Sequence, residues 1–396
     1  MKILYLVDSY YPEVRSATRL ARDLVREFAA QGHEVTLLTP SAEISSPMTI
    51  DREGEVRIVR VRSGPTKGIN RVIRALNEVR LSTGIWRRAR TFLEANRHDL
   101  VVSYSPTIFF GDLVHRLKRV WGARSYLILR DIFPQWAAET GVLSRRHPAY
   151  WYFARKARNQ YTAADVIGVQ SAGDLKHFNG AARRVEVLYN WLKPELPAPD
   201  GVDRRARYGL GNRFVFFYGG NIGVAQNLDL VVRLAAELAD NPRAYVLLVG
   251  DGHEVPRLSA EISRRRLGNI AIHPSVPEDE YFRLLADMDV GLISLDPRLT
   301  NNNFPAKLLG YLALGKPVLA ALNPGHELFD LLAKSDTGLA AVASDEGTFF
   351  EHARRLLNDP AAVRRMGENG PRLLASRFSA AAAARQIAAH FTPARP

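Results

Sequence analysis

The chain of 396 residues contains no cysteine. Disulfides, cysteine nucleophiles and cysteine-bound zinc or iron-sulfur sites are therefore excluded, and the composition is compatible with the cytoplasm. Long apolar runs are also missing: residues 100–114, the longest stretch with little charge, are interrupted by Pro106 and Asp112, whereas a membrane-spanning helix needs about 20 apolar residues. The apolar run over residues 1–7 ends at Asp8 and is too short for the core of a signal peptide. We therefore expect a cytoplasmic protein that meets a membrane only at its surface.

Two common nucleotide-binding motifs are absent as well. The loop after the first predicted strand reads Asp8-Ser9-Tyr10-Tyr11-Pro12 and contains no glycine, whereas dinucleotide-binding enzymes need glycines there so that the backbone can approach a pyrophosphate. No Gly-x-x-x-x-Gly-Lys-Ser/Thr segment occurs either. These absences disfavour nicotinamide and flavin dehydrogenases and P-loop NTPases.

Positive charge is concentrated in the first half of the chain. Residues 1–199 hold 31 Lys and Arg against 19 Asp and Glu, a net charge of +12, and residues 200–396 hold 23 against 22, a net charge of +1, which together make the +13 of the whole chain. This asymmetry favours an anionic partner for the first half, such as phosphate-bearing lipid, nucleic acid or a charged substrate. A basic surface that serves only solubility is the alternative.

Short apolar runs alternate with segments of helical periodicity along the chain, which predicts parallel sheets covered by helices. In the first half we expect a helix over residues 15–31 and strands over residues 2–7, 34–38, 56–61, 100–103, 125–129, 166–169 and 185–188. In the second half we expect strands over residues 214–218, 245–249, 270–272, 290–294 and 318–320. Prolines and glycine over residues 193–201 break both patterns and predict a linker.

The sequence thus predicts an α/β protein with two doubly wound, Rossmann-like domains over residues 1–195 and 202–375. An alanine-rich helix and tail over residues 376–396 are expected to return to the first domain. Open parallel sheets bind ligands beyond the carboxyl ends of their strands, so we expect the active site in a cleft between the two domains.

Glycines and polar residues follow the predicted strands of the second half. Backbone amides of a glycine-rich loop and the N-terminus of the next helix favour a diphosphate. Four segments of this kind are Gly220-Asn221-Ile222-Gly223, Gly250-Asp251-Gly252, His273-Pro274-Ser275-Val276 and Phe304-Pro305-Ala306-Lys307. Lys307 is the candidate phosphate cation, although a single lysine is more often a solvated surface residue. Together the four segments predict a nucleotide pocket.

In their order and spacing the motifs of the whole chain resemble glycosyltransferase family four, the retaining nucleotide-sugar transferases of the GT-B fold, and within it the amino-sugar transferases of bacterial O-antigen and capsule assembly. The motifs are Tyr10-Tyr11-Pro12, Leu129-Arg130-Asp131-Ile132-Phe133-Pro134, Tyr189-Asn190-Trp191, Gly220-Asn221-Ile222-Gly223 with Gln226, Val249-Gly250-Asp251-Gly252, and Phe304-Pro305-Ala306-Lys307 followed by Gly315-Lys316-Pro317.

The resemblance implies that the second domain binds the nucleotide-sugar donor, which we expect to be UDP-linked, and that the first binds the acceptor. It implies donor contacts, with the base near Val276, at Gly220, Asn221, Gln226, Gly250, Asp251, His273, Val276, Pro305, Ala306 and Leu308. Asp131 would position the sugar or acceptor, or alternatively cap a helix, and Lys307 and Arg130 would supply positive charge. No metal or other cofactor is expected, because Asp287-Met288-Asp289 lies at a helix-strand junction that explains its carboxylates.

Several positions depart from the family pattern. Asn221 and Gln226 stand where many members carry an arginine and a lysine, and the family's paired glutamates would fall on Asn302 and Gly310. We interpret these departures as the signature of the amino-sugar subgroup, in which Lys307 and Arg130 replace the missing positive charge.

Arginines are interleaved with aromatic and apolar residues over residues 67–92 and 150–158. Such segments suit anionic lipid headgroups, so we expect a peripheral protein on the inner face of the cytoplasmic membrane. Alternatively, aromatic residues such as Trp151 and Phe153 pack in the core.

The predicted function is transfer of an N-acetylated amino or deoxyamino sugar to a polyprenyl-diphosphate-linked or other lipid-linked glycan during synthesis of bacterial lipopolysaccharide O-antigen or capsule. A GT-B epimerase that acts on the donor alone is the alternative. Nucleic-acid binding is disfavoured, because no recognised nucleic-acid motif occurs.

Overall fold

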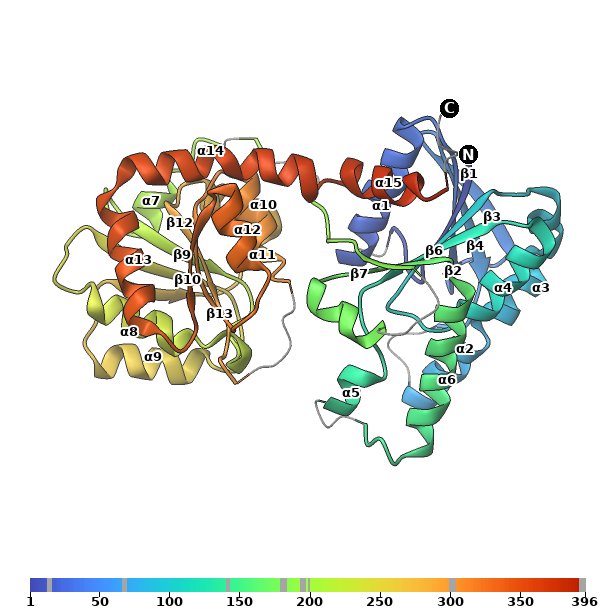
Figure 1. Cartoon of the computed structure of the whole chain (residues 1–396), viewed down its shortest axis with the longest axis horizontal. Coiled ribbons are helices and arrows are strands. Elements are labelled where there is room, and N and C mark those ends of the chain that lie inside the picture. The colour runs from blue at the N-terminus through green and yellow to red at the C-terminus, as the bar shows by residue number, and fades with distance from the viewer. Residues whose placement is uncertain are drawn as a thin grey trace. The chain divides into compact units, whose positions relative to one another are not determined.

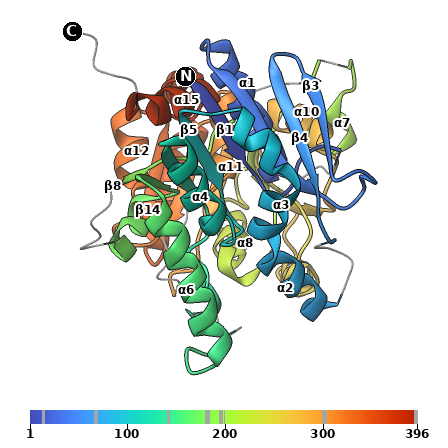
Figure 2. The ribbon, with the colours of Figure 1, turned by 90° about the vertical axis from the view of Figure 1, so that its right-hand side faces the viewer.

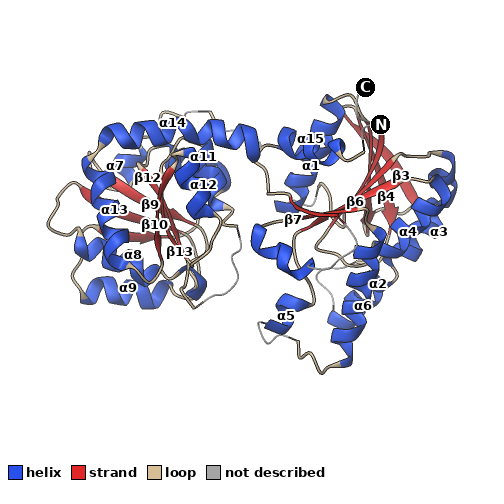
Figure 3. Ribbon diagram, viewed as in Figure 1, coloured by secondary structure: helices blue, strands red, loops and turns tan. Residues whose placement is uncertain are grey.

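The computed structural model describes residues 1–12, 16–65, 70–139, 143–178, 184–192, 197–198, 200–298 and 304–391. It divides the chain into two compact units (Figure 1): unit 1 comprises Met1–Asn190 with Ala380–Pro396, and unit 2 comprises Trp191–Ser379. Residues 193–196 and 199 of the expected linker lie outside the described residues. Each unit is an α/β structure with a central sheet (Figure 3), which confirms the predicted fold class.

Unit 1 is built on an eight-stranded sheet in the order β3-β4-β2-β1-β5-β6-β7-β8. Only β3 is antiparallel to its neighbour, β4. The strands are β1 Lys2–Leu6, β2 Glu34–Ser41, β3 Met48–Glu53, β4 Val56–Arg62, β5 Leu100–Tyr104, β6 Arg124–Leu129, β7 Val166–Val169 and β8 Arg184–Val187. The sequence does not predict β3, because this edge strand is largely exposed and lacks a continuous apolar run.

The helices of unit 1 bury their apolar faces against this sheet and against one another. Within one cluster, α3, α4 and α6 share a core with β1, β4 and β5 (Figure 2). The helical segments are α1 Ser16–Ala30, α2 Arg71–Val79, α3 Leu81–Ala95, α4 Gly111–Trp121, α5 Gln135–Glu139, α6 Pro148–Ala163, the 3₁₀ helix η1 Ala172–Phe178 and α15 Ala380–Ala389.

The C-terminal helix α15 is part of unit 1. It packs against α1, and Gln31 Nε2 donates to the carbonyl of Ala381 at 3.3 Å. Gln386 Nε2 donates to the carbonyl of Val187 at 2.9 Å, and His390 contacts Glu186 at 2.9 Å. The return of the chain to unit 1 begins at Ala380, after the expected boundary at residue 376.

Unit 2 contains a six-stranded parallel sheet in the order β11-β10-β9-β12-β13-β14, the strand order of a doubly wound nucleotide-binding fold. The strands are β9 Phe214–Gly219, β10 Ala244–Val249, β11 Ile270–His273, β12 Val290–Ser294, β13 Val318–Leu322 and β14 Gly338–Val342. The sequence does not predict β14, which is a short edge strand of small residues.

The helices of unit 2 lie on both sides of this sheet (Figure 1). They are α7 Arg204–Arg207, the 3₁₀ helix η2 Val224–Gln226, α8 Leu228–Glu237, α9 Val255–Arg264, α10 Glu278–Ala286, α11 Lys307–Ala313, α12 Leu328–Ser335, α13 Glu346–Asn358 and α14 Pro360–Arg377. Among the described residues of both units, no helix is both long and apolar enough to cross a bilayer.

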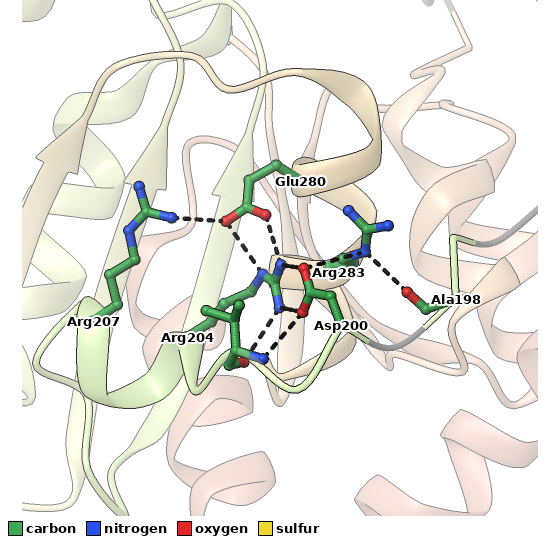
Figure 4. A network of polar contacts seen from close by, with 7 residues as sticks. Ala198, Asp200, Arg204, Arg207, Glu280 and Arg283 are labelled. Atoms are coloured by element: carbon green, nitrogen blue, oxygen red, sulfur yellow. Dashed lines mark hydrogen bonds and ion pairs between the residues drawn. The ribbon is translucent and has the colours of Figure 1, made fainter.

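A network of ion pairs fixes the first residues of unit 2 to α10 (Figure 4). Arg204 is only 4% exposed, and its guanidinium reaches Asp200 at 2.6 Å and Glu280 at 2.7 Å. Arg283 of α10 donates to the carbonyl of Ala198 at 3.0 Å. Because α10 follows the loop that contains Val276, the network anchors the chain before β9 close to a segment of the candidate site.

Candidate functional site

Two glycine loops at the carboxyl ends of β9 and β10 form one backbone platform. The N–H of Gly220 donates to the carbonyl of Val249, and the N–H of Ile222 donates to the carbonyl of Asp251, both at 2.9 Å. A side chain at Gly250 would collide with the carbonyl of Gly220. Gly220 itself has a φ of +132°, a backbone conformation that L side chains rarely adopt. The glycines are therefore required for the close approach of the two loops.

Asn221 and Gln226 hold the β9 loop in shape. Gln226 Oε1 accepts hydrogen bonds from the N–H of Gly223 at 3.2 Å and from Asn221 Nδ2 at 3.1 Å. The hydroxyl of Tyr218 donates to the carbonyl of Asn221 at 2.6 Å. These neutral side chains stabilise the loop without adding positive charge to it. A cation for this loop must therefore come from another element.

Lys307 supplies that cation from the first residue of α11. Its Nζ lies 3.6 Å from the centroid of the Tyr218 ring and 3.8 Å from the point that a Cβ on Gly220 would occupy. Burial lowers the pKa of Lys307 to about 7, because an ammonium loses hydration there, while the ring face favours the charged form. The sequence predicts that Lys307 and Gly220 belong to one phosphate site, and the structure brings the two residues together.

The loops after β10 and β11 meet beside the platform. The N–H of Gly250 donates to the carbonyl of His273 at 2.9 Å, and the hydroxyl of Ser275 donates to the carboxylate of Asp251. Burial lowers the pKa of His273, whose ring lies 4.8 Å from that of Tyr208. Val276 follows in the same loop and is half-buried. The carboxylate of Asp251 thus holds the loop that contains His273 and Val276 through its hydrogen bond with Ser275.

The remaining candidates of unit 2 lie around the start of α11. Ala306 is exposed and Pro305 is half-buried, whereas the Leu308 side chain is buried in the core and its N–H donates to the carbonyl of Pro305 at 3.1 Å. A Cβ on Gly310 would face Phe282 and Leu285, so a glutamate there would meet apolar side chains. Asn302 lies outside the described residues.

Arg130 and Asp131 follow β6 in unit 1. The Arg130 guanidinium donates to the carbonyl of Leu188 at 2.9 Å and lies 5.7 Å from the centroid of the Tyr104 ring. Asp131 is exposed, and desolvation by the surrounding protein nevertheless raises its pKa, an effect that the charge of Arg130 opposes. Arg130 is therefore tied to its own unit, whereas the carboxylate of Asp131 belongs to an exposed residue.

The carboxylate of Asp289 has structural partners. It accepts a hydrogen bond from the N–H of Val215 at 2.8 Å and lies 3.6 Å from Arg205. Met288 between the two aspartates is buried. Among the described residues, no group of three or more histidine or acidic side chains could hold a metal ion.

The basic segments of unit 1 separate into buried and exposed side chains. Ile85 and Trp86 belong to the core, and Phe153 packs against Phe109 and Phe133. Trp151, by contrast, is 66% exposed. From the exposed side chains of these segments we define a basic aromatic face, which comprises Ile73, Leu76, Arg80, Arg87, Arg88, Trp151, Tyr152, Arg155 and Arg158. They come from α2, α3 and α6 and from Arg80 between α2 and α3, and Figure 2 shows α2 and α6 projecting from the same end of unit 1.

The sequence does not predict the roles of several residues of the site. Tyr218 belongs to the apolar run of β9, and nothing in that run distinguishes a tyrosine that supports a lysine from one that packs in the core. Tyr208 carries no motif of its own. Ser275 belongs to a predicted segment, but nothing in that segment indicates its hydrogen bond to Asp251. Their roles depend on which loops the sheet brings together.

Two family models match the chain. Residues 17–191 match a glycosyl transferase 4-like domain, and residues 203–373 match the group 1 glycosyl transferases. Together the two matches cover most of both units.

Curated relatives are similar over different lengths. The chain is 25% identical over 380 residues to a putative colanic acid biosynthesis glycosyl transferase, WcaI, of Escherichia coli K12, covering 87% of this chain and 89% of the relative. It is 26% identical over 258 residues to a probable glycosyltransferase, WbjE, of Pseudomonas aeruginosa, covering 63% of this chain and 64% of that relative.

Solved structures share the fold. Anabaena HepE in complex with UDP superimposes with a TM-score of 0.67 at 18% identity, covering 98% of this chain and 99% of HepE. WaaG, a glycosyltransferase involved in lipopolysaccharide biosynthesis, superimposes with a TM-score of 0.62 at 15% identity, covering 99% and 100% of the two chains. At this identity the likeness concerns the fold alone.

Proposed function

Because this chain belongs to glycosyltransferase family four and has the GT-B fold, we propose that it moves a sugar, with retention of configuration, from a nucleotide-diphosphate donor to a lipid-linked glycan. The proposed product is a bacterial surface polysaccharide, since WcaI is named for colanic acid biosynthesis and WaaG for lipopolysaccharide biosynthesis. The amino-sugar donor and the UDP carrier are part of the proposal, and HepE, which binds UDP, supports the carrier.

One observation carries the donor assignment: the amine of Lys307 lies against the glycine platform of Gly220 and Gly250. A diphosphate on this platform would approach bare glycine backbone and meet the Lys307 amine in a partly desolvated place, where a charged hydrogen bond is stronger than in water. The same lysine would stabilise the nucleoside diphosphate as it leaves. Leaving-group stabilisation is the main demand of sugar transfer, and in this proposal Lys307 meets it.

In this proposal Asp131 positions the sugar or the acceptor hydroxyl. Its carboxylate is exposed, follows β6 directly, and has a raised pKa. A carboxylate of this kind can accept a hydrogen bond from a hydroxyl group of the acceptor or stabilise positive charge that develops on the sugar ring.

We further propose that the basic aromatic face binds the inner surface of the cytoplasmic membrane, where a polyprenyl-diphosphate-linked acceptor resides. Trp151, Arg155 and Arg158 recur at helical spacing and are exposed on α6, and α2 exposes Ile73 at 52% and Leu76 at 48%. Exposed apolar side chains beside arginines suit the boundary between lipid headgroups and acyl chains.

A calorimetric screen of nucleotide-diphosphate sugars against the purified chain tests the proposal. We expect one UDP-linked amino sugar to bind, and a membrane fraction to be required for its turnover. Conversion of the donor in the absence of any acceptor would instead identify an epimerase. No binding of any nucleotide-diphosphate sugar would contradict the proposal.

A further inference from the structure

Unit 1 contains a cavity of about 580 Å³ at the carboxyl ends of β1, β2 and β4. Its walls are the loop over residues 8–12, the segment over residues 39–44 at the end of β2, and residues 63–65 after β4. Ligands bind in this position in open parallel sheets, and the volume is that of a small-molecule site.

The described residues that line the cavity carry a net charge opposite to that of the first half of the chain. Among the described lining residues, the side chains that carry a full charge at neutral pH are Asp8, Glu43, Asp51 and Arg60. The described lining thus contains three carboxylates and one guanidinium, a net charge of −2, within a chain half whose net charge is +12.

The guanidinium of Arg60 is already engaged. Its Nη1 lies 2.6 Å from the carboxylate of Asp51, and its Nη2 donates to the carbonyl of Tyr11 at 2.9 Å. The Arg60 side chain is 20% exposed. An incoming phosphate would have to compete with Asp51 for this arginine, and it would do so beside two further carboxylates.

The uncharged part of the lining is rich in hydroxyl groups. The residues that carry them are Ser9, Tyr10, Tyr11, Thr39, Ser41, Thr49 and Ser63, of which Tyr10 already donates its hydroxyl to Glu53. Hydroxyl groups both donate and accept hydrogen bonds, which suits a ring that carries several hydroxyl groups of its own.

A separate cluster holds the wall of the cavity in place. The Tyr10 hydroxyl donates to Glu53 at 3.0 Å, and Glu53 also pairs with Arg22 at 2.6 Å and Arg26 at 2.7 Å. Arg22 in turn lies 4.7 Å from the centroid of the Tyr11 ring. Tyr10 and Tyr11 are thus fixed before a ligand arrives, which lowers the entropic cost of binding.

We propose that this cavity binds a sugar or cyclitol ring of the acceptor that carries no phosphate or carboxylate, and that it binds such a ring more tightly when the ring carries an amine. The inference rests on the proposed function, because it identifies the cavity as the acceptor site. The anionic part of a lipid-linked acceptor then stays outside the cavity. Carboxylates around an ammonium gain charge-assisted hydrogen bonds, whereas a phosphate is repelled.

The test uses three sets of probes on the full chain at constant salt: methyl glycosides of gluco, galacto and manno configuration, their 2-amino-2-deoxy forms, and their 6-phosphates. Binding is measured by saturation-transfer NMR and calorimetry. For at least one configuration we expect the amine to bind about tenfold more tightly than the phosphate. Equal or tighter binding of the phosphates, or no binding of any glycoside, would overturn the proposal.

The Asp51→Asn variant should bind one probe more tightly, and a protein that failed to fold would bind no probe more tightly. The substitution releases Arg60 from its carboxylate and removes one negative charge, so the 6-phosphate should gain affinity by about tenfold while the amine loses affinity. Glu94→Gln is the matched control, since Glu94 pairs with Arg90 on the surface of the same unit. An unchanged ranking in Asp51→Asn contradicts the proposal.

UDP binding is measured in the same samples. If UDP binds and the glycosides rank with the phosphate first, the inference about the cavity fails and the donor assignment stands. If neither UDP nor any glycoside binds, the proposed function itself fails.

Discussion

The amine of Lys307 lies 3.6 Å from the centroid of the Tyr218 ring and 3.8 Å from the point that a Cβ on Gly220 would occupy. Tyr218 also donates its hydroxyl to the carbonyl of Asn221. One tyrosine therefore supports both the lysine and the loop. This relationship places a cation at the glycine platform even though the loop itself carries the neutral residues Asn221 and Gln226.

Replacing Lys307 with alanine should lower donor turnover by about 100-fold, because the leaving diphosphate loses its cation in a partly desolvated site. The measurement is steady-state kinetics with the donor found in the screen. Lys334→Ala is the control, since Lys334 forms an exposed pair with Asp330. Unchanged turnover in Lys307→Ala would show that the cation comes from elsewhere.

Donor binding should depend on pH through Lys307. Its pKa in the free protein is lowered to about 7 by burial, so the ammonium is present below that pH and is lost as the pH rises through it. The affinity for a nucleotide-diphosphate sugar, whose diphosphate does not titrate in this range, should fall between pH 6 and pH 9, measured by calorimetry. A Lys307→Arg variant keeps its charge, and its binding should be nearly independent of pH.

Replacing Asp131 with asparagine should lower transfer by at least about 100-fold and leave nucleotide binding intact. The carboxylate is in unit 1, whereas the glycine platform belongs to unit 2, so calorimetry with UDP and kinetics with an acceptor separate the two effects. Asp112→Asn is the control, because Asp112 pairs with Lys156 on the surface of unit 1. Loss of UDP binding in Asp131→Asn would argue for a structural role.

Reversing the charge of Arg155 and Arg158 should release the protein from anionic vesicles. Each arginine near a lipid surface contributes about 1 kcal/mol, so the double change to glutamate should weaken binding to phosphatidylglycerol vesicles by more than tenfold in a sedimentation assay. Changing Arg264 and Arg265 of unit 2 to glutamate is the matched control. If the unit 1 variant and the unit 2 control bind the vesicles equally well, the basic aromatic face is not the membrane-binding surface.

Replacing Arg204 with methionine should destabilise unit 2, because the carboxylates of Asp200 and Glu280 lose the guanidinium that they share. We expect a lower midpoint of urea unfolding, followed by circular dichroism. Arg207→Met provides the comparison, since Arg207 also reaches Glu280 but is 62% exposed, and exposed pairs contribute little. Equal destabilisation by the two changes would contradict this reading of the network.

Much of the fold is readable from the sequence. Buried parallel strands are continuous apolar runs, so β1, β9 and β12 are predicted within one residue of their ends. The edge strands β3 and β14 are missed, because they are half-exposed or made of small residues and lack that signal. The glycine loops are also visible in the sequence, since only glycine permits such close backbone contact.

Other parts of the site were decided by tertiary structure. The sequence indicates Gly220 and Lys307 separately, but only the order of β9 and β12 in the sheet brings α11 to the glycine loop. The same holds for Tyr218 under the lysine, for Glu53 behind Tyr10, and for the acidic cavity in a basic unit. Local patterns specify strands, helices and turns because they depend on neighbouring residues. Contacts between residues far apart in the chain depend on how those elements pack, and no local pattern records them.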